Sequence, residues 1–292
     1  MIIKTENVSY IYQEGTAMAS VALSGVSTEI GNGQFIGLIG HTGSGKSTFV
    51  QLLNGLLKPT SGRVLCDDVD IFSDGYNRRA LRARAGLVFQ YPEHQLFEET
   101  VLKDVCFGPK NMGMSADEQA SCAREALNSV GIDESCYQKS PFELSGGQKR
   151  RAAIAGVLAM HPELLILDEP TAGLDPRGRD EIYDLISKMH SERDMTILLV
   201  SHSMDDVARY MDRIIVMNEG NIAFDGVPKE VFSHYKELES MGLAAPQIMY
   251  IMNYLKESGL PVKTDMLTVE EAAAEIIAHR NEIPVCAKIE RQ

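Results

Sequence analysis

The chain has 292 residues, of which 44% are hydrophobic and 24% charged, and its formal net charge is −13. This composition is typical of a globular protein, and the acidic balance argues against general nucleic-acid binding, which needs a basic surface to displace phosphate counterions. An acidic surface would suit a basic partner, although solubility alone explains it equally well. No apolar run approaches the roughly 18 residues of a membrane helix, and we expect no secretion signal at the start of the chain.

The cysteines are scattered and show no CxxC spacing, which argues against a zinc site or a disulfide framework. We expect free thiols in a reducing environment. The five positions are Cys66, Cys106, Cys122, Cys136 and Cys286.

The first part of the chain predicts short strands followed by a strand, a loop and a helix. Residues 1–32 read as short strands and turns, and 34–40 as an apolar strand that leads into a glycine-rich loop. A helix is expected over 47–57, ending before Pro59, and β-like pieces over 60–90.

The second part alternates between strand and helix after a mostly helical stretch at 115–160. The alternation predicts a parallel sheet covered by helices. The strands are expected over 164–168, 196–201 and 213–217, and the helices over 177–192 and 203–211.

The C-terminal part differs from this pattern. Apolar residues at helical spacing predict one helix between Pro246 and Gly259. Thr268 and Glu271 have the spacing of a capping box and predict the start of another helix. We expect a domain boundary near 230–240.

A glycine-rich loop at 40–48 predicts a nucleoside triphosphate site. Its glycines allow several N–H groups to point at one anion, and the following helix adds its positive end. Lys46 would reach the β- and γ-phosphates and the Ser47 hydroxyl would ligate Mg²⁺. A glycine turn that happens to precede a lysine is the plainer alternative, which the flanking strand and helix disfavour. The loop comprises Gly40, His41, Thr42, Gly43, Ser44, Gly45, Lys46, Ser47 and Thr48.

Two carboxylates follow the apolar strand at 164–168. Asp168 ends the strand and would lie at the carboxyl edge of the sheet, where ligands of open parallel sheets bind. It could hold Mg²⁺ through water, and Glu169 could polarise an attacking water. A solvated acidic pair is the alternative, and the phosphate loop argues against it.

A third segment places a hydroxyl and two glycines at the start of a helix, which is again an anion-binding arrangement. Read alone, it could be a loop with a helix-capping serine. Ser145 lies 99 positions after Lys46, so we expect it to serve a different nucleotide from the one at Lys46. The segment comprises Leu144, Ser145, Gly146, Gly147 and Gln148.

Together the three motifs resemble those of the ATPase subunits of ATP-binding cassette (ABC) transporters. In that family the loop at Ser145 closes over ATP held by a second cassette. Four weaker landmarks match in the same order: Tyr12 for the aromatic that stacks on adenine, Gln90 for the glutamine between metal site and transporter, Asp175 for the loop linking two sites, and His202 for the histidine at the γ-phosphate.

The resemblance implies an α/β fold: a P-loop cassette with a mostly parallel sheet core, an antiparallel β subdomain and a helical subdomain at about 91–160. It implies ATP and Mg²⁺ as cofactors. Catalytic roles fall to Glu169, His202, Lys46 and Gln90, and metal binding to Ser47, Gln90 and Asp168. The cassette would span 1–235, and 236–292 would be a small C-terminal helical extension.

Segments 91–97 and 148–156 look like those of the energy-coupling factor branch, which imports vitamins and transition-metal ions. Its ATPases pair, often as two different chains, below a membrane scaffold (T) protein that holds a small substrate-capture (S) protein. The chain would thus associate peripherally with the cytoplasmic side of the cell membrane. The extension resembles the dimerisation region of that branch, with packing on its own domain as the alternative. His41, Arg150 and Arg151 favour the second of two paralogous ATPases.

Other classes remain as alternatives. A cobalt-type or peptide-type importer ATPase is the nearest. A soluble chromosome-type cassette would carry a long coiled coil between Lys46 and Ser145, and ribosome-associated types usually carry two cassettes in one chain. A non-enzymatic module would not need both Glu169 and His202. The sequence leaves open which substrate is transported and whether the pair is a homodimer or a heterodimer. It also leaves open whether both ATP sites formed between the two cassettes hydrolyse ATP.

Overall fold

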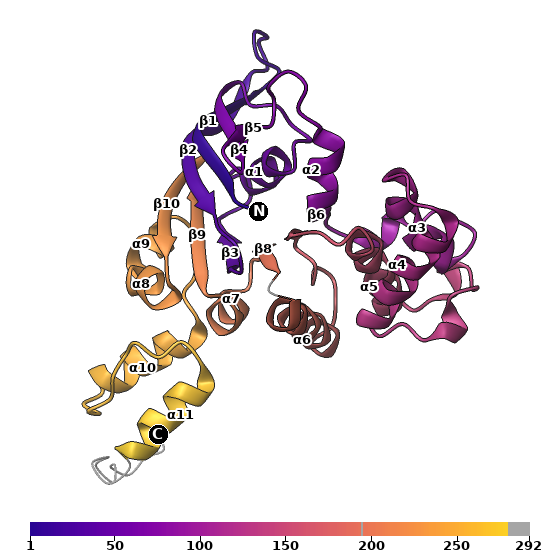
Figure 1. The fold of residues 1–292 in the computed structure, drawn as a ribbon. Coiled ribbons are helices and arrows are strands. Elements are labelled where there is room, and N and C mark those ends of the chain that lie inside the picture. The colour runs from indigo at the N-terminus through magenta and orange to yellow at the C-terminus, as the bar shows by residue number, and fades with distance from the viewer. Residues whose placement is uncertain (194, 280–292) are drawn as a thin grey trace.

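The computed structural model describes residues 1–193 and 195–279 (Figure 1). Its centre is a mostly parallel sheet with strand order β10-β9-β3-β8-β7-β6, in which only β10 runs antiparallel to its neighbour. The prediction of a parallel sheet is therefore confirmed. The strands are β3 (Phe35–Ile39), β6 (Ala85–Val88), β7 (Leu164–Asp168), β8 (Thr196–Val200), β9 (Arg213–Asn218) and β10 (Asn221–Gly226).

A second, antiparallel sheet has the order β2-β1-β4-β5. The helix α1 (Lys46–Leu53) packs in the apolar cluster shared by this sheet and one face of the central sheet. The strands are β1 (Ile3–Tyr12), β2 (Ser20–Ile30), β4 (Ser61–Cys66) and β5 (Val69–Asp70). This is the antiparallel β subdomain that the sequence resemblance implies.

Side chains of the central strands alternate between two hydrophobic clusters, as the period of two in a strand requires. Ile36 and Leu38 of β3 join the cluster around α1, while Phe35 and Ile39 join the cluster on the opposite face. The opposite face is covered by α6 (Pro176–Arg193) and α7 (Met204–Tyr210). Because both faces are buried, these strands are nearly continuous apolar runs, and this made them easy to predict.

The helical subdomain lies to one side of the central sheet (Figure 1). It is built from α3 (Val101–Asn111), α4 (Ala116–Ser129) and α5 (Gly146–Leu158). One-turn helices connect them and their neighbours: η1 (Pro92–Gln95), η2 (Glu134–Cys136) and η3 (Pro141–Glu143). At the junction, α5 approaches β6 so closely that a Cβ on Gly86 would lie 2.4 Å from Val157 Cγ1.

The C-terminal part contains α8 (Pro228–Ser233), α9 (Tyr235–Ser240), α10 (Gln247–Glu257) and α11 (Val269–Ala278). Helices α10 and α11 form a separate small cluster around Ile248, Met252, Val262 and Ala272. It is tied to α7 by a hydrogen bond from Gln247 N to Asp205 Oδ1 of 2.9 Å.

Three local features differ from the predictions. The helix expected over 47–57 ends at Leu53, since Asn54 caps it and the left-handed Gly55 (φ +68°) cannot continue it. The β-like pieces expected around Gly62 and Gly86 are present as β4 and β6. Between them lies the helix α2 (Arg78–Arg84), which begins after the N-cap Asn77.

Helix α3 was not predicted, since Gly108 and Pro109 obscure its pattern. At α11 the Thr268 hydroxyl accepts from Glu271 N as expected. Glu271 accepts from Leu267 N rather than from Thr268 N, so the capping box is only half formed.

In the described residues, no helix combines the length and apolar character needed to cross a membrane. Cys66, Cys106, Cys122 and Cys136 are free thiols, and Cys286 lies outside the described residues.

The packing of α1 gives a stability prediction. Phe49 is fully buried between the two sheets. Phe49→Ala should lower the free energy of unfolding by about 3–5 kcal/mol, because it removes apolar contacts and leaves a cavity. Denaturant unfolding measures this, with Met18→Ala at a 78% exposed position as the control. Equal midpoints for the two variants would contradict the assignment of this core.

Candidate active site

The loop between β3 and α1 is shaped by glycines and closed by its own lysine. Gly45 has φ +102°, and a Cβ there would lie 2.5 Å from Ala22 O of β2, so only glycine fits. Lys46 Nζ donates to Gly40 O (2.7 Å) and His41 O (2.9 Å). Burial lowers the pKa of Lys46, and the nearby carboxylates of Glu169 and Asp168 partly oppose this shift. The ammonium is therefore held over the loop, next to the N-terminus of α1.

Asp168 is the last residue of β7 and is 8% exposed. Burial raises its pKa, while the Ser47 hydroxyl, which hydrogen-bonds to it, acts in the opposite direction. The structure thus brings together the first residue after Lys46 and the end of a strand more than 100 positions later, as the sequence predicted.

Glu169 adopts a left-handed backbone conformation with φ +50°. This turn separates its side chain from that of Asp168. Gln90 Nε2 donates to Glu169 Oε2 (2.9 Å), and His202 Nε2 lies 2.5 Å from Glu169 Oε1. Each oxygen of the carboxylate thus has its own neighbour. The three residues follow β6, β7 and β8, which are adjacent in the sheet, so the parallel topology brings them together.

Tyr12 lies at the end of β1 and is 42% exposed. Its hydroxyl is 3.1 Å from Thr48 Oγ1, and its ring packs edge-on against Tyr10. An exposed aromatic face therefore stands beside the phosphate loop, in the antiparallel sheet.

The segment around Ser145 starts α5, and Figure 1 shows α5 and α1 in separate parts of the molecule. Ser145 caps the helix, since its hydroxyl accepts from Gln148 N (3.3 Å) and Gln148 Oε1 accepts from Ser145 N (2.9 Å). A Cβ on Gly146 or Gly147 would meet nothing within 4 Å. The first turn of α5 therefore presents an open face with unpaired N–H groups.

Asp175 is exposed and accepts a hydrogen bond from Gly178 N (2.7 Å) at the start of α6. Of the predicted site residues, the phosphate loop, Gln90, Asp168, Glu169 and His202 lie at one edge of the central sheet, and Tyr12 contacts the loop through Thr48. Ser145 lies in the helical subdomain.

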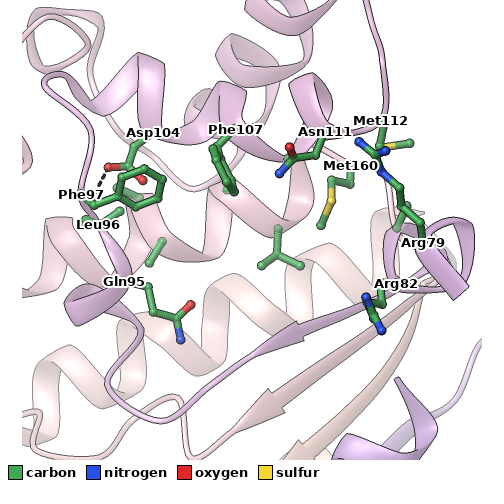
Figure 2. Close-up of a pocket in the computed structure, with 16 residues that line it drawn as sticks. Arg79, Arg82, Gln95, Leu96, Phe97, Asp104, Phe107, Asn111, Met112 and Met160 are labelled. Carbon is green, nitrogen blue, oxygen red and sulfur yellow. Dashed lines mark hydrogen bonds between the residues drawn. The ribbon is translucent and has the colours of Figure 1, made fainter. Parts of the chain in front are cut away.

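Sequence reasoning missed a groove of about 660 Å³ between α2, η1 and α3 (Figure 2). Phe97 and Phe107 pack edge-on in it with ring centroids 5.1 Å apart, and both are more than 40% exposed. Asp104 Oδ2 accepts from the N–H groups of Phe97 and Glu98 at 2.8 Å, which fixes the segment 96–98. The sequence had indicated the segment 91–97, whose last three residues line this groove, but not α3, which lines it as well.

Comparison with known proteins agrees with this geometry. A family model described as ABC transporter matches residues 23–172, and one described as AAA domain, putative AbiEii toxin, Type IV TA system matches 140–205. The energy-coupling factor transporter ATP-binding protein EcfA2 of Clostridium tetani is 55% identical over 95% of this chain and 96% of its own length. That of Caldanaerobacter subterraneus is 53% identical over 96% and 98%.

Solved structures give the same result. CbiO1 from Clostridium perfringens, part of the ABC transporter complex cbiONQ, has a TM-score of 0.72 and 43% identity over 86% of this chain and 98% of its own. The dimeric post-hydrolysis structure of the ATP-binding cassette MJ0796 bound to ADP and Pi has a TM-score of 0.68 and 31% identity over 77% and 98%.

The fold is that of an ABC transporter ATPase, and the family model covers the segment that holds the phosphate loop, Gln90 and Glu169. The sequence identity of more than 50% to the EcfA2 proteins, over nearly the whole chain, narrows the class to one branch of this family. The chain belongs to the energy-coupling factor transporter ATP-binding proteins.

The burial of Asp168 predicts a dependence of stability on pH. Its pKa is higher in the folded than in the unfolded state, so the folded state binds more protons just above the ordinary pKa of 3.8 and loses stability as pH rises through the raised value. Asp168→Asn should therefore raise the Tm of the nucleotide-free protein at neutral pH by about 2 °C or more. The difference should vanish below the ordinary pKa, where the carboxyl is protonated in both states.

Thermal unfolding over a pH series measures this, with Asp74→Asn at an exposed position as the control. A neutral-pH Tm equal to or below that of the wild type would contradict a desolvation cost at Asp168.

Proposed function

We propose that two cassettes close face to face around two ATP molecules and that hydrolysis reopens them, which drives uptake of a vitamin or transition-metal ion through a membrane scaffold. The observation that carries this proposal is the separation of the open face at Ser145 from the phosphate loop. Because of this separation, one chain cannot place both on the same ATP, and a second chain would have to supply the other part. The related cassette MJ0796 is dimeric with ADP and Pi bound, which supports such a pair.

The residues around Glu169 suit hydrolysis of a γ-phosphate. Phosphoryl transfer needs mainly positioning and charge stabilisation. Lys46 supplies positive charge at the phosphate loop, and Glu169 orients and polarises the attacking water. Gln90 and His202 each hold one Glu169 oxygen, so they fix the direction of this carboxylate. Tyr12 offers a ring for the adenine.

The donor set fits Mg²⁺. Ser47, Asp168 and Gln90 offer hard oxygen ligands, and in the described residues no cluster of three or more His, Cys, Asp or Glu side chains could hold a metal alone. Mg²⁺ is usually bound by one or two carboxylates together with substrate phosphates and waters, which matches a site of few protein ligands. The ion would neutralise charge on the phosphates when bound with ATP.

The groove of Figure 2 is where we place the scaffold protein. It is lined by exposed apolar side chains such as Phe97 and Phe107, with Arg79 and Arg82 at one end, so an amphipathic helix would fit. The segment 91–97 connects this groove to Gln90. A substrate-capture protein would then bind the scaffold, and the chain would lie at the cytoplasmic side of the cell membrane.

We assign 1–235 to the cassette, with the helical subdomain at about 91–160, and 236–292 to an extension that serves dimerisation. Ile251 and Tyr254 of α10 and Ile277 of α11 are more than half exposed, which favours a protein partner at this surface. A cobalt-type importer is the nearest alternative, because cbiO1 belongs to the complex cbiONQ. Neighbouring genes for a second cassette and a multi-span scaffold would separate the candidates.

Glu169→Gln tests the hydrolytic role. The variant should bind ATP with affinity close to the wild type and favour the closed pair, while turnover falls by about 10²–10⁴-fold because the general base is lost. Steady-state ATPase assays and size-exclusion chromatography with ATP and Mg²⁺ measure the two effects. Wild-type turnover in this variant would remove Glu169 from its role.

Phe107→Asp tests the docking surface. A carboxylate among the apolar side chains of the groove should abolish co-purification with the scaffold from membranes, while ATP binding stays unchanged. The matched control is Val69→Asp, which places the same charge at a 51% exposed apolar position on β5. Retained co-purification of Phe107→Asp would rule out this groove.

A further inference from the structure

Arg150 is an almost fully buried guanidinium in the second turn of α5. Its side chain is 2% exposed, and it lies five residues after Ser145 on the same helix. Buried arginines are rare unless they are paired, so its contacts show what it holds in place.

The guanidinium joins α5 to two other segments. Its Nε and Nη2 donate to the two carboxylate oxygens of Glu93 at 3.0 and 2.7 Å. Its Nη1 donates to Pro170 O (3.0 Å) and Ala172 O (2.8 Å). Burial raises the pKa of Glu93, but the hydrogen bonds and charge of Arg150, together with a backbone hydrogen bond, lower it overall. The two hydrogen bonds therefore make a bidentate ion pair.

Both segments lead directly to Glu169. Glu93 stands three positions after Gln90, which donates to Glu169, and Pro170 is the residue after Glu169. The two segments also lie close together, since a Cβ built on Gly173 would be in van der Waals contact with the ring of Tyr91, at 3.5 Å. Arg150 therefore closes a continuous path from the Glu169 carboxylate to the helix that starts at Ser145.

We infer that Arg150 is a positioning residue that fixes the loop at Ser145 relative to Gln90 and Glu169. The nucleotide state of one site would then set where this chain presents that loop to the partner's ATP. The inference rests on the proposed closure of two cassettes. An arginine is needed because only its planar fork can reach a carboxylate and two carbonyls at once. Lysine would supply the charge but not this geometry.

A purely structural ion pair is the competing explanation, and the chain offers a matched control. Arg213 makes a bidentate pair with Asp225 at 2.6 and 2.7 Å and also donates to a carbonyl, Glu29 O, at 2.8 Å. It lies on β9 and contacts none of the residues around Glu169.

The test uses the intact transporter complex with Arg150→Gln, Arg150→Lys, Glu93→Gln and Arg213→Gln. Both Arg150 variants should lower kcat by about tenfold or more, since a misplacement of roughly 1 Å can cost up to about 100-fold in rate. KM for ATP should stay within about threefold, because Tyr12 and the phosphate loop are untouched. Arg213→Gln removes an ion pair of the same geometry at a more exposed position (21% against 2%) and should keep the wild-type kcat.

Glu93→Gln keeps the size of the side chain and leaves both carbonyl contacts of Arg150 in place, so it carries the test if an Arg150 variant does not fold. It should lower kcat by at least about threefold at unchanged KM. The inference is overturned if kcat stays within about twofold of the wild type in the folded variants, or if Arg213→Gln loses kcat equally. A wild-type complex without ATP-dependent uptake would instead overturn the proposed function.

Discussion

The parallel alignment of β3, β6, β7 and β8 is the constraint on which the site depends. All four strands end at the same edge, and each is followed by a residue or loop that the site uses. Ladder hydrogen bonds and apolar packing on both faces fix this edge, and with it the starting points of the turns that carry the polar groups. Gln90, Glu169 and His202 come together from three separate turns only for this reason.

Within this edge the two adjacent carboxylates occupy different environments. Asp168 is buried against α1, where desolvation works against its charge, whereas Glu169 turns away through a left-handed backbone and lies between two polar side chains. A candidate metal ligand and a candidate base are thus neighbours in the sequence. The backbone conformation of Glu169, rather than its side chain, makes this division possible.

Much of the fold could be predicted from sequence. Strand β7 was predicted to the residue because four aliphatic side chains in a row fit only a strand buried on both faces. Prediction failed where long-range contacts determine whether a helix forms or where it ends. Helix α1 stops at Asn54, whose amide bonds Ala85 O on a distant strand, and α3 forms despite Gly108 and Pro109 because it packs on α4 and α5.

The same limit applies to the site. The phosphate loop and the carboxylates were local motifs, but Arg150 and Glu93 lie 57 positions apart, and nothing in either segment alone identifies the other as its partner.

The position of Tyr12 has a consequence for the nucleotide-free chain. Its ring belongs to the antiparallel sheet, whereas the phosphate loop belongs to the central one, and a hydroxyl contact with Thr48 joins them there. A nucleotide with its base on Tyr12 and its phosphates on the loop would therefore connect the antiparallel sheet to the central sheet. The β1–β2 hairpin is already attached at that corner by this contact, by a hydrogen bond from Ser24 N to Gly220 O and by the apolar cluster around α1. Nucleotide would therefore reinforce an attachment that the chain makes by itself.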